Sequence, residues 1–194
     1  MLGSFEEAEY RLHDMTKVLY SATMSLDGFI AGPGGDMSWL KEHLGGPNPV
    51  ADDLVGKIGA LLIGARTFRG DDPHRGTDKE GAFGGAWTGP QFVLTHRPPN
   101  DPVPGITFVD DLTRGLAAAK AAAGDRYVNI LGADVAAQCL AAGLLDEILV
   151  FIAPVLLGDG VRLFHHPGGA HVSLDQVTIA PAPVPTIWLR TRRR

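Results

Sequence analysis

The sequence predicts an α/β fold with a mostly parallel central sheet, helices on both faces and an antiparallel hairpin at the C-terminus. Three observations lead to this prediction. Short apolar runs rich in β-branched residues recur between turn signals. Helical stretches separate most of these runs, and strands that alternate with helices form parallel sheets covered on both faces. The last two runs have no helix between them, so we expect them to pair as an antiparallel hairpin at the sheet edge.

The expected strands are apolar runs of strand length that end at glycine, proline or polar turn residues. Six are well marked, and the two nearest the C-terminus are weaker. In chain order they are residues 17–23, 60–63, 92–95, 107–109, 127–131, 147–153, 172–179 and 186–190.

Three helices are expected between these strands. Asp111 is placed to cap the second helix, because its carboxylate can accept hydrogen bonds from the free N–H groups of the first turn. Glycine ends the second and third helices, since it adopts the left-handed conformation of a helix terminus at little cost. The helices are residues 52–58, residues 112–123 before Gly124, and residues 133–142 before Gly143.

The chain length of 194 residues suits one domain. The apolar pattern begins only after Met15, so we expect residues 1–15 to be an extension and residues 16–194 to form a single domain. Two stretches, 31–49 and 69–90, are rich in glycine and proline. Loops of this length in a compact domain are commonly functional or disordered.

Composition excludes several classes of protein. The net charge of −5 argues against nucleic acid as a partner, because phosphate binding needs a concentrated basic face. The basic C-terminal run is expected to be solvated. No stretch approaches the roughly 18–20 apolar residues that span a bilayer, and the acidic N-terminus lacks the apolar core of a secretion signal. The single cysteine, Cys139, excludes an internal disulfide and a cysteine-rich metal site, which favours a reducing, cytoplasmic location.

Residues 127–135 carry the clearest local signal for a binding site. A buried-strand run ends at Gly132, and a helix begins immediately after it. Glycine lets a ligand approach the backbone closely, and the free N–H groups of a first helical turn attract anions. This turn is a candidate pyrophosphate cradle, and the alternative is that it only connects a strand to a helix.

A second strand end repeats this pattern in residues 60–68. The strand ends at Gly64, followed by Arg66 and Thr67. An arginine at a helix start can bind a phosphate with two hydrogen bonds. Its other interpretation is a surface arginine that caps a turn.

A third strand end, in residues 92–99, offers a hydroxyl and two potential cations in Thr95, His96 and Arg97. Such a set suits a 2′-phosphate. Ligands of open α/β sheets bind outside the carboxyl ends of the strands. Three such ends together therefore favour a nucleotide site.

Four motifs in sequence order resemble the dihydrofolate reductase superfamily. They are ATMSLDGFIAGPGGDMSWL (22–40), LLIGARTF (61–68), FVLTHRPP (92–99) and LLDEILVFIAPVLLGDGVRLF (144–164). Within it they are similar to the reductase domain of riboflavin biosynthesis, the RibD C-terminal domain, and its stand-alone bacterial relatives. The resemblance covers about residues 16–190. It implies a dihydrofolate reductase-like fold, NADPH as cofactor, a pyrimidine or pterin-type substrate, a relationship to 5-amino-6-(5-phosphoribosylamino)uracil reductase, and a homodimer.

The resemblance also implies which residues bind NADPH. Thr23 and Ile30 would flank the nicotinamide, and residues 31–38 would close over it. The family usually has a glycine pair where this chain has Gly132 and Ala133, and a methyl group there would crowd the cofactor. The other contacts would be Gly64, Arg66 and Thr67 to the phosphates, Thr95, His96 and Arg97 to the 2′-phosphate, and Gly132, Ala133, Asp134 and Val135 to the pyrophosphate.

The proton donor is expected at an acidic residue on the first helix, as in folate reductases. Asp53 is the nearest match and Asp52 the next, although both could be exposed helix-capping residues. Asp27 could orient the substrate, or its Asp-Gly step could only form a tight turn. Trp39 matches an aromatic residue that walls the folate pocket, and its alternative is simple packing.

The glycine-rich segment 81–90 contains Phe83 and Trp87, which could stack on a flat heterocycle as part of a lid. The alternative is a disordered surface loop. Neighbouring histidines, His165 and His166, do not make a metal site without a further ligand, so no metal is expected. The zinc deaminase domain of related enzymes needs a pair of cysteines that this chain lacks.

Two functional hypotheses remain open. The first is an NADPH-dependent reductase of a small heterocycle, with its site between loops 31–49 and 69–90. The second is a non-catalytic nucleotide- or flavin-binding module on the same fold.

Overall fold

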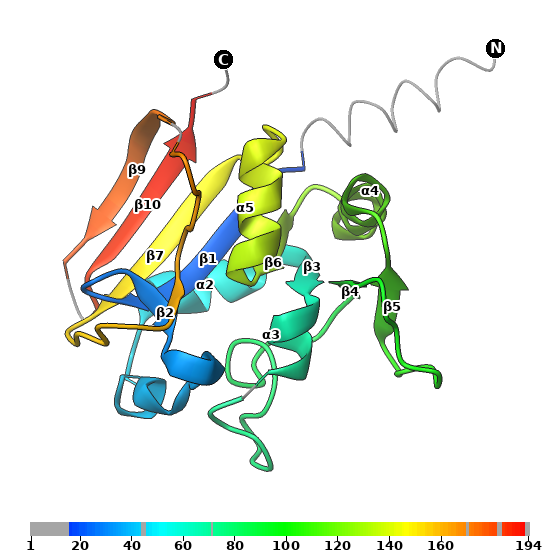
Figure 1. The fold of residues 1–194 in the computed structure, drawn as a ribbon, viewed down its shortest axis with the longest axis horizontal. Helices are drawn as coiled ribbons and strands as arrows, with labels where there is room; N and C mark the ends of the chain where they lie inside the picture. Colours follow the sequence, from blue (N-terminus) through cyan, green and yellow to red (C-terminus); the bar gives the residue numbers. More distant parts are fainter. Residues whose placement is uncertain (1–15, 44–45, 71, 170, 182–183, 193–194) are drawn as a thin grey trace.

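The chain is built around an eight-stranded sheet, shown in Figure 1. The computed structural model describes residues 16–43, 46–70, 72–169, 171–181 and 184–192. The predicted extension 1–15 and the last two arginines lie outside the described residues. The strands are β1 (Val18–Ser25), β2 (Phe29–Ala31), β3 (Ile58–Gly64), β4 (Gln91–Leu94), β5 (Ile106–Val109), β6 (Tyr127–Leu131), β7 (Glu147–Ala153), β8 (Val161–Arg162), β9 (Leu174–Ala180) and β10 (Thr186–Thr191).

The large sheet is mostly parallel. Its strand order is β5-β4-β3-β6-β1-β7-β10-β9, and all neighbours from β5 to β7 pair in parallel. Strand β10 is antiparallel to both β7 and β9. The predicted parallel sheet with a C-terminal antiparallel hairpin is therefore confirmed.

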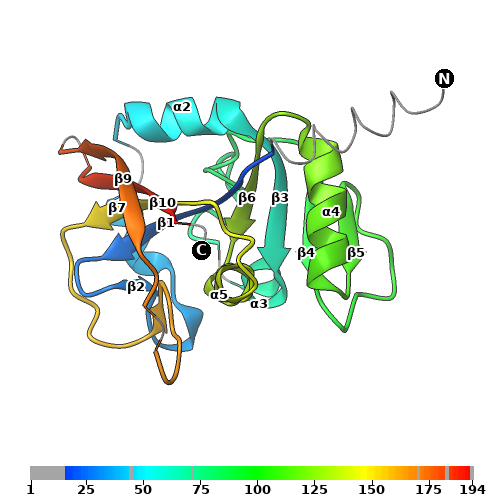
Figure 2. The same cartoon turned by 90° about the horizontal axis from the view of Figure 1, so that it is seen from above.

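Helices cover both faces of this sheet. Figure 2 shows α2 on one face and α4 and α5 on the other. The short α3 follows β3 directly, at the carboxyl edge of the sheet. The helices are α2 (Pro49–Lys57), α3 (Ala65–Arg69), α4 (Leu112–Ala123) and α5 (Ala133–Ala141), with two 3₁₀ turns at Pro33–Gly35 and Ser38–Glu42.

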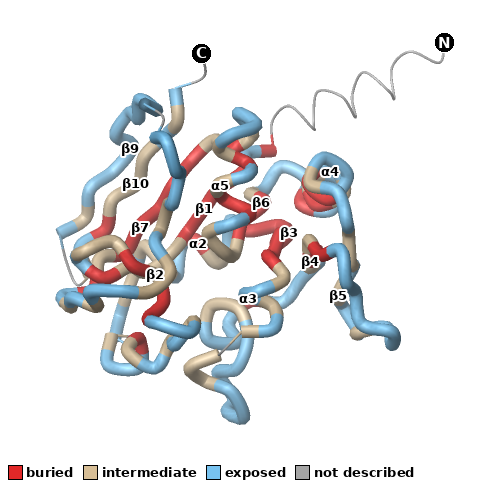
Figure 3. Tube along the Cα trace, viewed as in Figure 1, coloured by how far each residue is buried: buried red, intermediate tan, exposed pale blue. Residues whose placement is uncertain are grey.

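Alternation along the strands divides the core between the two faces. Val18 and Tyr20 of β1 pack with α4 and α5, whereas Leu19 packs with Leu54 of α2. Successive side chains of a strand point to opposite faces, so a sheet covered on both sides has strands that are apolar throughout. Figure 3 shows this burial in the central strands and the exposure of the edge strand β9.

The structure differs from the sequence prediction at the start of α2 and in its shortest strands and turns. Helix α2 begins three residues before the predicted 52–58, because Asn48 caps it by accepting from the N–H of Ala51 and Pro49 suits the first helical turn. Strands β2 and β8, which pair with each other, were not among the predicted strands, and the 3₁₀ turns lie in the stretch 31–49 that was predicted as a loop. The predicted Asp111 cap of α4 is confirmed, since its carboxylate accepts from the N–H of Arg114.

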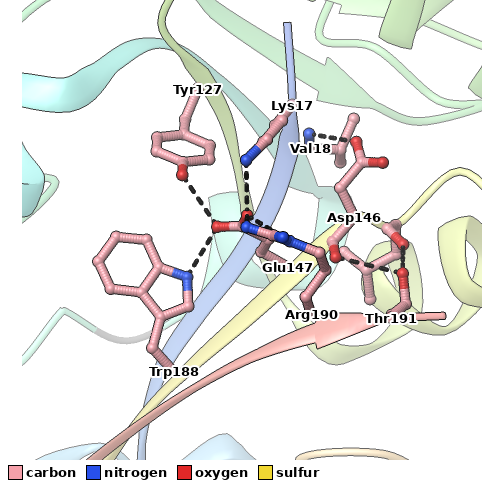
Figure 4. A network of polar contacts seen from close by, with 9 residues as sticks. Lys17, Val18, Tyr127, Asp146, Glu147, Trp188, Arg190 and Thr191 are labelled. Atoms are coloured by element: carbon pink, nitrogen blue, oxygen red, sulfur yellow. Dashed lines mark hydrogen bonds and ion pairs between the residues drawn. The ribbon is translucent and has the colours of Figure 1, made fainter. Parts of the chain in front are cut away.

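A buried carboxylate joins the C-terminal hairpin to the parallel strands at the edge of the sheet where β7 begins (Figure 4). Glu147 is 1% exposed and accepts hydrogen bonds from Lys17 Nζ at 2.9 Å, Tyr127 OH at 2.9 Å and Trp188 Nε1 at 2.8 Å. Arg190 adds Nε and Nη2 at 3.3 Å. Burial alone would raise the pKa of Glu147, but the hydrogen bonds from Lys17 and Tyr127 outweigh burial and hold this pKa below its ordinary value. The network fixes β10 against β1, β6 and β7.

In the part of the chain that the structure describes, we find no helix with the length and apolar character needed to cross a membrane.

Candidate functional site

The carboxyl ends of the central strands open into one large cleft with a volume of about 2340 Å³. Parallel strands bring their carboxyl ends to the same edge of a sheet, where ligands of such folds bind. Segments of both long loops, 31–49 and 69–90, contribute to the lining, as the sequence predicts. The cleft exceeds the roughly 300–1,000 Å³ of sites for one small ligand, so it has room for a dinucleotide and a second molecule.

The structure brings together all the residues predicted to bind the cofactor. Each of them lines the cleft, although their role toward NADPH stays a prediction. They are Thr23, Ile30, Gly64, Arg66, Thr67, Thr95, His96, Arg97, Gly132, Ala133, Asp134 and Val135.

The turn between β6 and α5 forms a close cradle in the cleft wall. Gly132 has a φ of +113°, and a Cβ added there would lie 2.5 Å from Oγ1 of Thr67. A Cβ on Gly64 would lie 3.2 Å from Cγ2 of Val135. Only glycine fits at Gly132, and it has no side chain to cap the N–H groups at the start of α5. The cradle therefore offers backbone donors to an anion, as the pyrophosphate of a dinucleotide requires.

An ion pair crosses this part of the cleft. Arg66 Nη2 lies 2.5 Å from Oδ2 of Asp134, in the first turn of α5, and both side chains are exposed. The pair holds a predicted phosphate-binding arginine beside the helix start. A phosphate bound there would compete with the Asp134 carboxylate for Arg66.

The carboxyl end of β4 forms a second candidate anion site. Thr95 is buried, its N–H donates to Val109 O at 2.8 Å, and its Oγ1 accepts from the N–H of Arg97 at 3.1 Å. His96 and Arg97 are exposed at the cleft. Arg69, which no sequence motif indicated, also reaches this turn and donates from Nη2 to Arg97 O at 2.5 Å. The donor set of a hydroxyl, an imidazole and guanidinium groups fits a phosphate monoester.

Of the two neighbouring acids on α2, only Asp52 lines the cleft. Asp53, the nearer match by sequence, instead pairs with Lys57 one turn along the helix, with 2.5 Å between Oδ2 and Nζ. Successive helical residues are rotated by about 100°, so the face that docks on the sheet decides which one reaches the cleft. The preference for Asp53 over Asp52 is therefore not supported by its position.

Asp27 does not line the cleft. Its carboxylate accepts from Ser25 Oγ at 2.5 Å, from Gly158 N–H at 2.7 Å and from Leu157 N–H at 3.1 Å. The hydrogen bond from Ser25 is the main cause that lowers the pKa of Asp27 to about 2, and the two N–H groups add to it. Asp27 therefore forms the turn, the alternative stated for it, and ties the β1–β2 turn to the loop after β7.

The predicted aromatic residues occupy different environments. Trp87 is 8% exposed, and its indole N–H donates to Ile58 O at 3.2 Å, so it belongs to the core on the α2 face and not to a lid. Trp39 lies outside the cleft lining, and its buried indole N–H has no hydrogen-bond partner among the described residues. Phe83 lines the cleft with an unusual φ of +55°. It remains the aromatic candidate for stacking on a flat ligand.

The described residues contain no group of three or more histidine, cysteine, aspartate or glutamate side chains gathered as metal ligands.

Comparison with known proteins gives one family and several similar folds. The family described as RibD C-terminal domain matches residues 16–182. An uncharacterised protein of Bacillus subtilis (strain 168), YwjB, is 27% identical over 155 residues, which cover 76% of this chain and 82% of that protein.

Two solved structures illustrate the shared fold. The diaminohydroxyphosphoribosylaminopyrimidine deaminase/5-amino-6-(5-phosphoribosylamino)uracil reductase of Thermotoga maritima superposes with a TM-score of 0.66 at 17% identity, over 95% of this chain and 59% of that one. Dihydrofolate reductase from Enterococcus faecalis, solved with NADP(H), superposes with a TM-score of 0.55 at 14% identity, over 92% and 96% of the two chains. These likenesses confirm the dihydrofolate reductase-like fold.

Proposed function

This chain belongs to the RibD C-terminal domain family, and from that premise we propose that it is an NADPH-dependent reductase. Its substrate would be a small flat heterocycle of the pyrimidine or pterin type, like that of 5-amino-6-(5-phosphoribosylamino)uracil reductase. One observation carries the proposal. The ends of β3, β4 and β6, each with anion-binding groups, line a single cleft that is large enough for a dinucleotide and a substrate.

The chain's own residues would bind and orient the cofactor, which supplies the hydride when bound. The turn at Thr95, His96 and Arg97 would bind the 2′-phosphate. Gly132 and the start of α5 would receive the pyrophosphate, with Arg66 released from Asp134 to join it. The nicotinamide would then lie toward Thr23 and Ile30, which also line the cleft.

We assign the role of proton donor to Asp52, because it is the acid of α2 that lines the cleft. Phe83 would form an apolar wall for the heterocycle. Its positive φ supports this role, because backbone strain at a bulky residue is retained where the surrounding structure requires it, often at a ligand site.

The test is a titration of the purified protein with NADPH and NADH, followed by energy transfer from tryptophan to the nicotinamide. We expect NADPH to bind in the micromolar range and more tightly than NADH. If the protein binds NADPH, it should then oxidise NADPH with at least one pterin or pyrimidine in a substrate screen. Absence of binding to either nucleotide would overturn the proposal.

A non-catalytic nucleotide- or flavin-binding module is the second candidate. It is favoured by one specific observation: the two acids matched first as catalytic, Asp53 and Asp27, are held by Lys57 and by Ser25 outside the cleft lining. A module would bind nucleotide without consuming it. Turnover with any heterocycle excludes this candidate.

We also propose a homodimer in the cytoplasm. The edge strand β9 exposes Leu174, Val177 and Ile179, and an unpaired apolar edge is a ready surface for a second chain. Light scattering on the purified protein would detect a dimer, and charged substitutions at Val177 and Ile179 should dissociate it.

A further inference from the structure

We propose that Arg69 is a positioning residue that sets the preference for NADPH over NADH, an inference that rests on the proposed function. Arg69 is the last residue of α3. Its Nη2 donates to the carbonyl oxygen of Arg97 at 2.5 Å and lies 3.4 Å from Oγ1 of Thr95. One side chain thus connects α3 to the turn at the end of β4.

This turn needs support because its functional side chains are exposed. His96 and Arg97 both lie on the surface of the cleft, whereas Thr95 is buried. Thr95 fixes the start of the turn through its bonds to Val109 O and Arg97 N–H. Arg69 fixes the other end, at the carbonyl of Arg97. A turn held at both ends loses less conformational freedom when it binds a phosphate, and a smaller ordering cost means tighter binding.

The bond to Arg97 O also settles the orientation of a peptide dipole. A carbonyl oxygen that faced a phosphate would repel it, whereas this oxygen is occupied by the guanidinium of Arg69. Arg69 therefore acts on the 2′-phosphate through the turn. NADH lacks that phosphate, so its affinity should depend little on Arg69.

A general electrostatic effect is the competing explanation, because any cation near the cleft attracts a phosphate. Arg75 offers a matched comparison. It also lies along the cleft, but its Nη2 donates to Gly70 O at 2.7 Å, at the end of α3. Arg69→Gln and Arg75→Gln remove the same charge, and only the first breaks the bond to the turn. Arg69→Lys keeps the charge but has a shorter side chain without the planar guanidinium.

The experiment measures the affinities of wild type, R69Q, R69K and R75Q for NADPH, NADH and 2′,5′-ADP, with thermal unfolding of each protein as a check on folding. We expect R69Q and R69K to bind NADPH and 2′,5′-ADP about tenfold more weakly than wild type, the scale of a lost hydrogen bond to a charged group. NADH should change less than twofold, and R75Q should keep the wild-type ratio of NADPH to NADH affinity.

Three results would overturn this inference. R69K could bind NADPH as tightly as wild type, R75Q could bind NADPH as weakly as R69Q, or R69Q could lose affinity for NADPH and NADH by the same factor. If wild type itself binds neither nucleotide nor 2′,5′-ADP, the proposed function fails first. If wild type prefers NADPH and R69Q keeps that preference, only the role of Arg69 fails.

Discussion

Replacing Gly132 by alanine should place a methyl group where the wall of the cleft has no room for it. The new Cβ would lie 2.5 Å from Oγ1 of Thr67, a separation at which one of the two groups must move. A φ of +113° adds backbone strain of about 1–3 kcal/mol for a residue with a side chain. Overpacking typically adds about 1–3 kcal/mol. The free energy of unfolding should therefore fall by about 2–6 kcal/mol, a large part of the roughly 5–15 kcal/mol of an ordinary domain.

Gly124→Ala separates the two contributions. Gly124 also has a positive φ, +65°, but an added Cβ meets nothing within 4 Å. This control should lose only the strain, about 1–3 kcal/mol, and should keep its affinity for NADPH. Gly132→Ala should lose more stability in a urea titration followed by circular dichroism, and should bind NADPH at least tenfold more weakly because the cradle must widen.

A second substitution tests the contact itself. In the G132A background, Thr67→Ala removes the Oγ1 that the new methyl group meets, so it should recover part of the lost stability. The reasoning is refuted if G132A and G124A lose the same free energy of unfolding, or if G132A folds and binds NADPH like wild type.

Three further predictions concern carboxylates. Glu147→Gln should lower the free energy of unfolding, measured by urea titration, by about 2–4 kcal/mol, because the cationic and aromatic donors around it lose their buried negative charge. The control Asp175→Asn, which breaks an exposed ion pair, should cost much less. Asp27 stabilises the fold fully above its ordinary pKa of 3.8, and this contribution is lost as pH falls toward about 2. Between these pH values the melting temperature of D27N should therefore depend less on pH than that of wild type. The same pH dependence in both proteins would contradict the assignment. Asp52→Asn should lower kcat for NADPH oxidation at least about 100-fold, the scale of general acid catalysis, whereas Asp53→Asn should leave kcat within twofold; the reverse order would return the role to Asp53.

Local signals were sufficient for strand β6 and helix α4. Strand Tyr127–Leu131 and helix Leu112–Ala123 were predicted with the bounds that the structure has, because β-branched residues, an aspartate cap and terminal glycines mark them. Strands β2 and β8 have three and two residues, too few to show an alternating pattern. They form because the chain folds back on itself, which no local pattern reports.

The candidate site could likewise be predicted only in part. Residues at the ends of strands could be placed together from the sequence, since a parallel sheet brings those ends to one edge. The choice between Asp52 and Asp53 could not be made, because it depends on how α2 is rotated against the sheet. The burial of Trp87 depends on the carbonyl of Ile58, 29 residues away in the chain. Arg69 carries no local signal, since its partners follow the next strand.

The most direct test of the central claim is a crystal structure of the protein with NADP⁺. We predict electron density for the dinucleotide in the cleft, with its pyrophosphate at Gly132 and the start of α5 and its 2′-phosphate within hydrogen-bond distance of Thr95, His96 or Arg97. Density for the nucleotide at another surface, or a 2′-phosphate away from the end of β4, would contradict the account.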